Sequence, residues 1–230
     1  MPKPFAVNPD VLCNIRPMQW RDVPRVAELH HAAMGKSLWA QLGQGFLREI
    51  YRSLLCTNEF IAFVYEEEHQ IEGFIAGSTH TEAMMQSALR QRTVRLSLKT
   101  ILGLRNPSVL KRLLDTPKYF KQSAPSTSVT AESLFCSFTP KLRGKRISGH
   151  INKVLFDTLY HLGHRQVKIT TETDNVGANR QLTSWGFENQ STFHFYDKEM
   201  VLYVLNFETS DRVQAQDWRH PATLTNFQSN

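Results

Sequence analysis

Residues 134–149 read LFCSFTPKLRGKRISG. An apolar strand is followed by a basic turn and then by the start of a helix at about Ile147. The first turn of a helix presents unpaired backbone N–H groups and a partial positive charge, which together suit a phosphate group. Gly144 allows close backbone approach, and the turn's charge comes from Arg143, Lys145 and Arg146. The stretch predicts either a phosphate-binding turn or a basic turn that is simply solvated.

The chain after this stretch alternates helices and strands. Apolar residues from Ile147 to Leu162 recur at helical spacing, and Gly163 ends that helix. Val167–Thr171 is rich in β-branched residues and predicts a strand. A helix over 175–185 closes at Gly186, and apolar residues between Phe193 and Val204 predict a final hairpin.

The chain before this stretch begins with a short strand over Ile15–Met18, after which Asp22 is placed to cap a helix that runs to Ala33. A second amphipathic helix follows over Phe46–Leu55. The period then changes, and Phe60–Tyr65 and Ile71–Ser78 form a hairpin across the polar turn 66–70. Antiparallel strands followed by strand–helix–strand–helix order predict a mixed sheet flanked by helices.

Positive charge is concentrated in one segment, residues 84–122. The segment holds nine basic residues and one acidic residue, Asp115, so its net charge is +8 against +6 for the whole chain. It predicts two helices, interrupted near Asn106 and Pro107, that are inserted into the domain as a lid. Leucines beside the charges leave open a surface that contacts an anionic membrane or nucleic acid, or that is covered by a second copy in a homodimer.

Length and composition exclude several classes of protein. The chain has 230 residues, 41% of them hydrophobic and 21% charged, so collagen, low-complexity disorder and coiled coil are ruled out. The longest apolar runs are too short to span a bilayer, and the first ten residues lack the apolar core of a signal peptide. Cys13, Cys56 and Cys136 are widely spaced, which predicts reduced thiols packed as small hydrophobes, no metal site and a cytoplasmic protein. We expect a single domain over 1–230, with its core at about 12–207 and a polar tail at 208–230.

The order of three motifs resembles the GNAT superfamily of acyl-CoA-dependent N-acetyltransferases. The turn Arg143–Ser148 is similar to that family's Gln/Arg-x-x-Gly-x-Gly/Ala signature, and Asn175 to Ala178 is similar to its Asn-x-x-Ala. The Gly186–Phe187 pair follows Asn175 at the family's spacing. Ile15-Arg-Pro and the strand over 71–77 are similar to the family's opening strands, so the resemblance covers roughly residues 12–207.

The resemblance implies an α/β fold (an α+β mixed sheet) with a GNAT-like, mostly antiparallel central sheet that contains a splayed strand pair. It also implies an acyltransferase that moves an acetyl or other short acyl group from coenzyme A to a primary amine, in a ternary complex. The pantetheine arm would bind the strand edge at Cys136, Ser137 and Phe138. The pyrophosphate would lie over the N–H groups of Gly144, Lys145, Arg146, Ile147, Ser148 and Gly149, beside Arg143, with Asn175 on the cofactor arm. Asn175 also fits an ordinary helix N-cap.

Three positions depart from the family pattern. Arg146 stands where the family has its middle glycine, and Ser148 stands at its last small residue. An arginine there either strains the turn or forms a charged fork over the pyrophosphate. Leu182 stands where many relatives have the tyrosine that protonates the leaving thiolate, and a leucine transfers no proton.

Aminolysis needs a base that deprotonates the acceptor amine. Glu132 precedes the strand in the run Ala131–Cys136, which is similar to the family's histone acetylases, where such a glutamate is the base. Other relatives place a glutamate where this chain has Thr170, and Glu172 lies two residues further on. Tyr196 is a candidate proton donor, and His80 is a further candidate.

Two other functions remain open at this point. One is a non-catalytic acyl-CoA-binding regulatory protein, which the three departures favour. The other is a module that binds nucleic acid or anionic membrane through residues 84–122. For an enzyme, the acceptor is a small-molecule amine, an amino sugar or a protein amine, with no nucleic acid partner expected, and the basic segment mildly favours an acidic acceptor.

Overall fold

A computed structural model describes residues 5–34, 38–90, 127–195, 198–210 and 213. These residues form a seven-stranded mixed sheet in the order β1-β2-β3-β4-β5-β7-β6. The strands are β1 (Ile15–Pro17), β2 (Phe60–Glu67), β3 (Gln70–Ser78), β4 (Glu132–Phe138), β5 (Gln166–Glu172), β6 (Glu188–Phe195) and β7 (Lys198–Asn206). Every neighbouring pair is antiparallel except β4 and β5, which are parallel.

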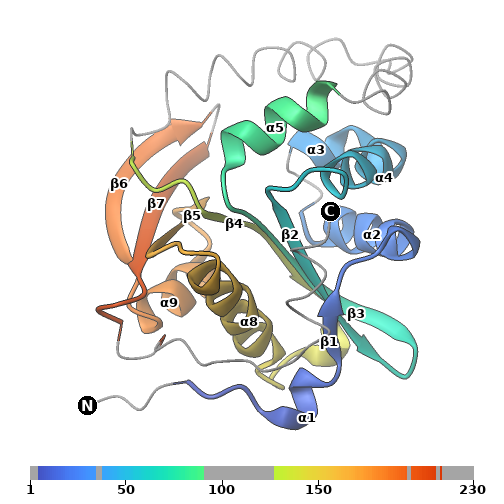
Figure 1. Ribbon diagram of the computed structural model, residues 1–230, viewed down its shortest axis with the longest axis horizontal. Coiled ribbons are helices and arrows are strands. Elements are labelled where there is room, and N and C mark those ends of the chain that lie inside the picture. The colour runs from blue at the N-terminus through green and yellow to red at the C-terminus, as the bar shows by residue number, and fades with distance from the viewer. Residues whose placement is uncertain (1–4, 35–37, 91–126, 196–197, 211–212, 214–230) are drawn as a thin grey trace.

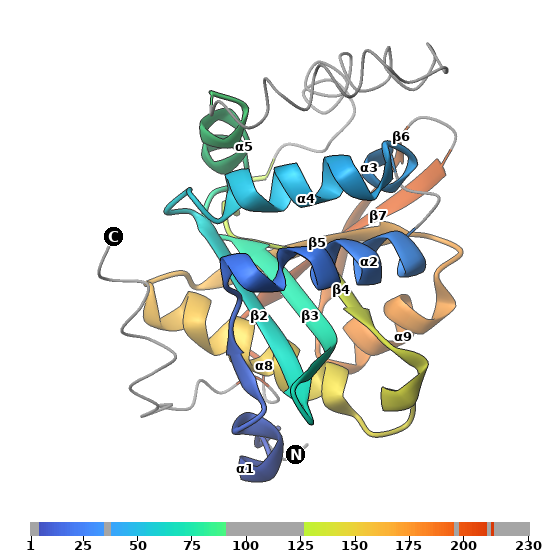
Figure 2. The ribbon, with the colours of Figure 1, turned by 90° about the vertical axis from the view of Figure 1, so that its right-hand side faces the viewer.

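Helices cover both faces of the sheet (Figures 1 and 2). The α-helices are α1 (Pro9–Leu12), α2 (Val23–Ala33), α3 (Leu38–Gln41), α4 (Gly43–Leu54), α5 (Thr81–Arg90), α8 (Ile147–His161) and α9 (Val176–Ser184), with single 3-10 turns at η1 (Trp20–Asp22) and η2 (Pro140–Leu142). One buried cluster lies between the sheet and α2 and α4, and the other lies between the sheet and α8. The predicted mixed sheet flanked by helices is confirmed.

The β2–β3 hairpin forms the centre of the N-terminal half. Phe60 to Tyr65 are all buried, because helices cover both faces of β2, so the run reads as continuous rather than alternating hydrophobicity. Glu68 and His69 at the turn both adopt positive φ, +52° and +62°. Two such residues match the right-handed twist of a tight hairpin, although neither is glycine. Gly73, close to this turn, pairs with Phe138, the last residue of β4, so the hairpin turn lies near the end of β4.

The C-terminal half follows the predicted order of strand, turn, helix and strand. Helix α8 begins at Ile147, where the basic turn ends, and Gly163 closes it with a φ of +92° that favours glycine. Strand β5 and helix α9 follow, and the predicted final hairpin is β6 with β7.

Two local predictions need correction. Asp22 occupies the N-cap of α2, but its carboxylate does not cap that helix. It accepts hydrogen bonds from the Gln19 N–H at 2.7 Å and from the guanidinium of Arg16. Asp22 is the last residue of the 3-10 turn η1 and has helical φ and ψ, whereas a capping residue is normally extended. The cysteines are free, but Cys13 and Cys56 are exposed rather than packed as small hydrophobes.

Part of the predicted domain organisation lies outside the described residues. Helix α5 covers the start of the basic segment, whose residues 91–122 are not described, and residues 214–230 of the tail are also outside. The boundaries of the insertion and of the tail therefore stay predictions. In the described part of the chain, no helix has both the length and the apolarity needed to cross a bilayer.

Candidate functional site

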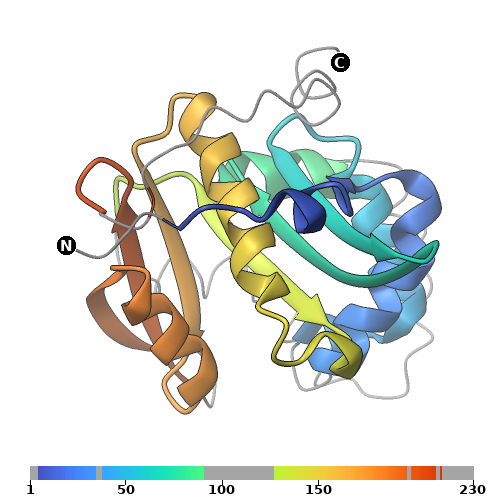
Figure 3. The ribbon, with the colours of Figure 1, turned by 90° about the horizontal axis from the view of Figure 1, so that it is seen from below.

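Strands β4 and β5 separate in the middle of the sheet. Their parallel register has two rungs, Glu132 with Lys168 and Ser133 with Ile169. Strand β4 nevertheless continues to Phe138 along β3, and β5 continues along β7, so the two strands diverge beyond the second rung (Figure 3). Backbone N–H and C=O groups on a strand edge need hydrogen-bond partners. The separation therefore offers an extended ligand a strand edge inside the sheet.

The turn at the open end of β4 has two residues in the left-handed region. Gly144 has a φ of +80°, and Arg146, the N-cap of α8, has φ +59° and ψ +16°. The left-handed conformation costs a residue with a side chain about 1–2 kcal/mol. Glycine would occupy the position of Arg146 without that cost, so the strain expected from the missing glycine is present in the backbone.

The first turn of α8 lacks a side-chain cap, so its backbone N–H groups are not blocked from binding an anion. Its N-cap residue, Arg146, makes no side-chain hydrogen bond to the backbone of this turn. The Gly149 N–H bonds back to the Arg146 carbonyl at 3.0 Å, and the Lys145 N–H bonds to the Leu142 carbonyl at 3.1 Å. These two N–H groups are therefore already used. Ile147 and Ser148, the first two residues of the helix, carry N–H groups that have no partner within the helix.

The cations around this turn are not equivalent, although Arg143, Lys145 and Arg146 are all exposed. The Lys145 ammonium lies 3.6 Å from a carboxylate oxygen of Glu67, on the β2–β3 hairpin. Glu67 also lies 2.9 Å from Lys141, and Lys141 followed by Lys145 lowers the pKa of its carboxyl. Among the described residues, no carboxylate lies within ion-pair distance of either arginine. The uncompensated charge of the turn therefore belongs to Arg143 and Arg146.

Packing against the N-terminal segment fixes the start of α8. The Phe5 ring lies 5.0 Å from both the His150 and the Trp185 rings, between centroids. A Cβ at Gly149 would lie 3.2 Å from the Phe5 ring, so the absence of a side chain there permits the close approach. The Asn8 N–H also bonds to His150 Nδ1 at 3.3 Å. The N-terminal segment thus sets the position of the helix start.

The side chains of the predicted cofactor strand already have structural contacts. The Cys136 thiol lies 3.8 Å from the Asn152 amide nitrogen, and burial raises its pKa to about 12, so it remains a neutral thiol. The Ser137 hydroxyl donates to the Leu29 carbonyl at 3.0 Å, on the opposite face of the sheet. The Phe138 ring covers Gly73. What these residues offer a ligand is therefore their backbone rather than their side chains.

Glu132 lies on the first β4–β5 rung, next to the separation. Its Oε2 accepts a hydrogen bond from the Thr81 hydroxyl at 2.7 Å and lies 4.0 Å from the Lys168 ammonium. The side chain is 13% exposed, and this burial raises the pKa of the carboxyl, while Lys168 and Thr81 act in the opposite direction. A partly dehydrated carboxylate beside the separation is suited to accept a proton.

Solved acetyltransferases share the fold of this chain. The ribosomal-protein-alanine N-acetyltransferase of Brucella melitensis is 14% identical, and the match covers 84% of this chain and 98% of that one with a TM-score of 0.54. A putative GNAT-family acetyltransferase from Desulfovibrio desulfuricans is 11% identical over 84% of this chain and 97% of its own, with a TM-score of 0.52. A putative acetyltransferase of Salmonella typhimurium, solved with its cofactor acetyl-CoA, is 13% identical over 84% and 92%, with a TM-score of 0.52. The chain has the GNAT fold. Neither a protein-family model nor a curated protein matches the sequence.

The other predicted site residues occupy varied places in this GNAT fold. Asn175 is the N-cap of α9, and its Oδ1 accepts the Ala178 N–H at 3.2 Å, as its alternative interpretation predicts. Its role on a cofactor arm stays a prediction. Leu182 is buried in the core, and Tyr196 lies outside the described residues. Glu172 forms an ion pair with Lys198.

Sequence reasoning missed both partners of Glu132. Thr81 carries no sequence signal, because it stands in a polar run between a strand and a helix. Lys168 does carry one, since it is the single charge within the otherwise uncharged strand Val167–Thr171. His80, the further candidate, caps α5 by accepting the Ala83 N–H on Nδ1 at 3.2 Å.

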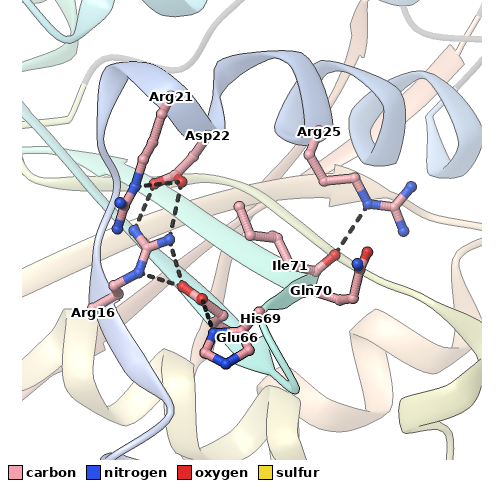
Figure 4. A pocket seen from close by; sticks show the side chains of 8 residues that line it. All are labelled: Arg16, Arg21, Asp22, Arg25, Glu66, His69, Gln70 and Ile71. Atoms are coloured by element: carbon pink, nitrogen blue, oxygen red, sulfur yellow. Dashed lines mark hydrogen bonds and ion pairs between the residues drawn. The ribbon is translucent and has the colours of Figure 1, made fainter.

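A separate pocket lies at the edge of the GNAT fold, between α2 and the β2–β3 hairpin (Figure 4). Its volume is about 530 Å³, and it is lined by Arg16, Arg21, Asp22, Arg25, Glu66, His69, Gln70 and Ile71. Arg16 holds Asp22 at 2.6 and 2.9 Å and Glu66 at 2.6 Å. These ion pairs tie β1, β2 and the start of α2 together. Most of the charged groups in this pocket are therefore paired with one another.

Proposed function

We propose that this protein is an N-acetyltransferase that moves an acetyl or other short acyl group from coenzyme A to a primary amine. One observation carries the proposal: the separation of β4 and β5 opens toward the turn where Arg143 and Arg146 have no acidic partner among the residues that the structure describes. Coenzyme A has a flexible pantetheine arm with amide groups, which suit a strand edge. The arm is joined to a pyrophosphate, which suits the cationic start of a helix. A cytoplasmic location agrees with this choice of co-substrate.

The residues present fit coenzyme A chemically. The backbone of Cys136–Phe138 would bind the pantetheine amides, since the side chains there are already used. The N–H groups at Ile147 and Ser148, with both arginines, would hold the pyrophosphate. Arg146 favours the charged fork, because its side chain is exposed and unpaired among the described residues.

The reaction needs one proton acceptor and one leaving group. Glu132 takes a proton from the acceptor ammonium, and the neutral nitrogen attacks the thioester carbonyl. A new C–N bond forms as the C–S bond breaks, the electron pair leaves on sulfur, and the attacking nitrogen loses its second proton to solvent. Leu182 supplies no proton to that thiolate, so solvent or Tyr196 protonates it. A thiolate whose parent thiol has a pKa of about 8.5 leaves without strong assistance.

The acceptor class is open among small-molecule amines, amino sugars and protein amines. The alanine acetyltransferase from Brucella melitensis is one protein of this fold whose name specifies a protein acceptor. A screen of amine classes with acetyl-CoA, followed by thiol release, tests the proposal directly. Thiol release above the hydrolytic background with one class of amine supports it. If the protein binds acetyl-CoA but acetylates no class of amine, the proposal that it is an acetyltransferase is wrong.

A non-catalytic acyl-CoA-binding protein is the second candidate function. The burial of Leu182 favours it, because the family's usual proton donor is replaced by a core side chain. Isothermal calorimetry with acetyl-CoA alone tests what the two candidates share, since both bind it at one site, and the amine screen separates them. No binding at millimolar acetyl-CoA would exclude both.

A further inference from the structure

The Glu132 carboxylate is held by two elements that lie far apart in the sequence. The Thr81 hydroxyl, in the first turn of α5, donates to Glu132 Oε2 at 2.7 Å. The Lys168 ammonium, on β5, lies 4.0 Å from the same oxygen. Lys168 is 20% exposed and Glu132 is 13% exposed, so solvent screens this contact less than it would screen one at the surface.

The backbone around Thr81 fixes the position of this residue next to Glu132. Ser78, the last residue of β3, pairs with Glu132 in the β3–β4 register. Its Oγ accepts the His80 N–H at 3.1 Å, and His80 in turn caps α5. A Cβ on Gly77 would lie 2.9 Å from the Glu132 carbonyl oxygen, so this residue allows β3 and β4 to approach closely. The chain therefore turns from β3 into α5 within two residues, directly over Glu132.

Lys168 reaches Glu132 through the parallel rung. The two residues are register partners, so their side chains leave the same face of the sheet. The rung is also the last but one before β4 and β5 separate. A lysine at this point brings a positive charge to the carboxylate without entering the separated region.

The two contacts act against the effect of burial. Dehydration favours the neutral acid, whereas a nearby cation and a hydroxyl donor favour the carboxylate. A general base must be ionised before it can accept a proton. Lys168 is the charged group that acts on Glu132 among the described residues, since β3 contributes Ser78 and the imidazole of His80 is turned to the α5 backbone.

We propose that Thr81 and Lys168 are positioning residues, which hold and orient the Glu132 carboxylate as the base for acyl transfer. The inference rests on the proposed function, because the role of Glu132 as base is part of it. It assigns a role in the chemistry to the first residue of α5, the helix that leads into the basic segment.

Titration of the Glu132 side-chain carboxyl by carbon-13 NMR tests the inference without a known acceptor, using the full chain. Glu132→Gln assigns the signal. Thr81→Val and Lys168→Met should each move the titration midpoint upward. Thr81→Ser and Lys168→Arg keep the hydroxyl and the charge, so they should return the midpoint toward the wild-type value. Thr79→Val and Lys198→Met are matched controls whose contacts lie elsewhere, and they should leave it unchanged.

Activity gives the second readout once an acceptor is known. The acidic limb of kcat/KM should move with the NMR midpoint in each variant, while the KM for acetyl-CoA stays unchanged. An unmoved midpoint in both Thr81→Val and Lys168→Met would overturn the inference, and an inactive Glu132→Gln would still leave the proposed function standing. A fully active Glu132→Gln would instead remove the base assignment itself, whatever the titrations show.

Discussion

The carboxylate of Glu67 lies 3.6 Å from the ammonium of Lys145, so the β2–β3 hairpin neutralises one of the three cations at the start of α8. The same carboxylate also binds Lys141. In the described part of the chain, Arg143 and Arg146 have no such partner, so we expect them to contribute more than Lys145 to the proposed acyl-CoA binding.

Removing an arginine should weaken coenzyme A binding more than removing the lysine. Arg143→Ala and Arg146→Ala should each lower the affinity about tenfold, because a hydrogen bond to a charged group contributes about 1.5–3 kcal/mol and exposure reduces that value. Lys145→Ala should cost less, and Glu67→Gln should strengthen binding by freeing Lys145. Calorimetry with acetyl-CoA measures all four variants. Equal losses for the three cations would show that Glu67 yields Lys145 to the ligand.

Arg146→Gly should stabilise the fold and lower the affinity for coenzyme A. Glycine adopts the left-handed backbone without the cost of about 1–2 kcal/mol, less the extra entropy that it loses on folding. We expect a net gain of at most about 1 kcal/mol in the free energy of unfolding, measured in urea. Arg146→Ala is the control, since it loses the same guanidinium and retains the strained φ. If the free energy of unfolding of the glycine variant is no higher than that of the alanine variant, the backbone at Arg146 is not strained.

Glu132→Gln should reduce turnover about a hundredfold or more, the usual scale for a general base, while acetyl-CoA still binds. It should also stabilise the fold at pH 7. Burial raises the folded-state pKa of this carboxyl above its ordinary 4.5, so wild-type stability falls as pH rises from 4.5 through the raised value. The glutamine variant avoids that loss. Its advantage in urea unfolding should vanish below pH 4.5, and an advantage that persists there would point to another cause.

Gly73→Ala should destabilise the protein through one contact at the end of β4. An added Cβ would lie 2.2 Å from the Phe138 ring, and the ring must move to admit it. Overpacking of this kind costs about 1–3 kcal/mol. Phe138→Leu should recover part of the loss in the double variant, as measured by urea unfolding. Gly45→Ala, with open space around its Cβ in helix α4, should be neutral or stabilising by about 0.5–1 kcal/mol.

The stability of the protein should fall between pH 6.5 and pH 4 because of His30. The ring is fully buried, with Nδ1 2.8 Å from the Tyr51 hydroxyl, and burial lowers its pKa from 6.5 to about 4. The unfolded chain therefore takes up the proton first as pH falls. At pH 5 the loss should reach about 2 kcal/mol relative to pH 7.5. His30→Gln should lower stability overall and flatten this dependence, whereas substitution of the exposed His194 should not flatten it.

Periodicity and turn signals in the sequence predicted most of the described helices and strands and their order. Helical and strand periodicities located the β2–β3 hairpin, the strand before the basic turn, and the helix from Ile147 to Gly163. The resemblance to GNAT proteins then predicted that two central strands splay, and the two-rung register of β4 and β5 confirms it. These features are readable because periodicity, turn chemistry and motif spacing are properties of neighbouring residues.

Which charges of the site form ion pairs could not be predicted from the sequence, because the partners come from distant parts of the chain. Lys145 and Arg143 look alike in the sequence, yet a hairpin far away in the chain supplies Glu67 to one of them. Glu132 was a candidate from its position in the sequence. Its partners are Lys168, which strand register places beside it, and Thr81, which the start of helix α5 places beside it. The physical reason is that an ionisable group responds to whatever lies within a few ångströms of it. That neighbourhood is set by strand register and helix docking rather than by distance along the chain.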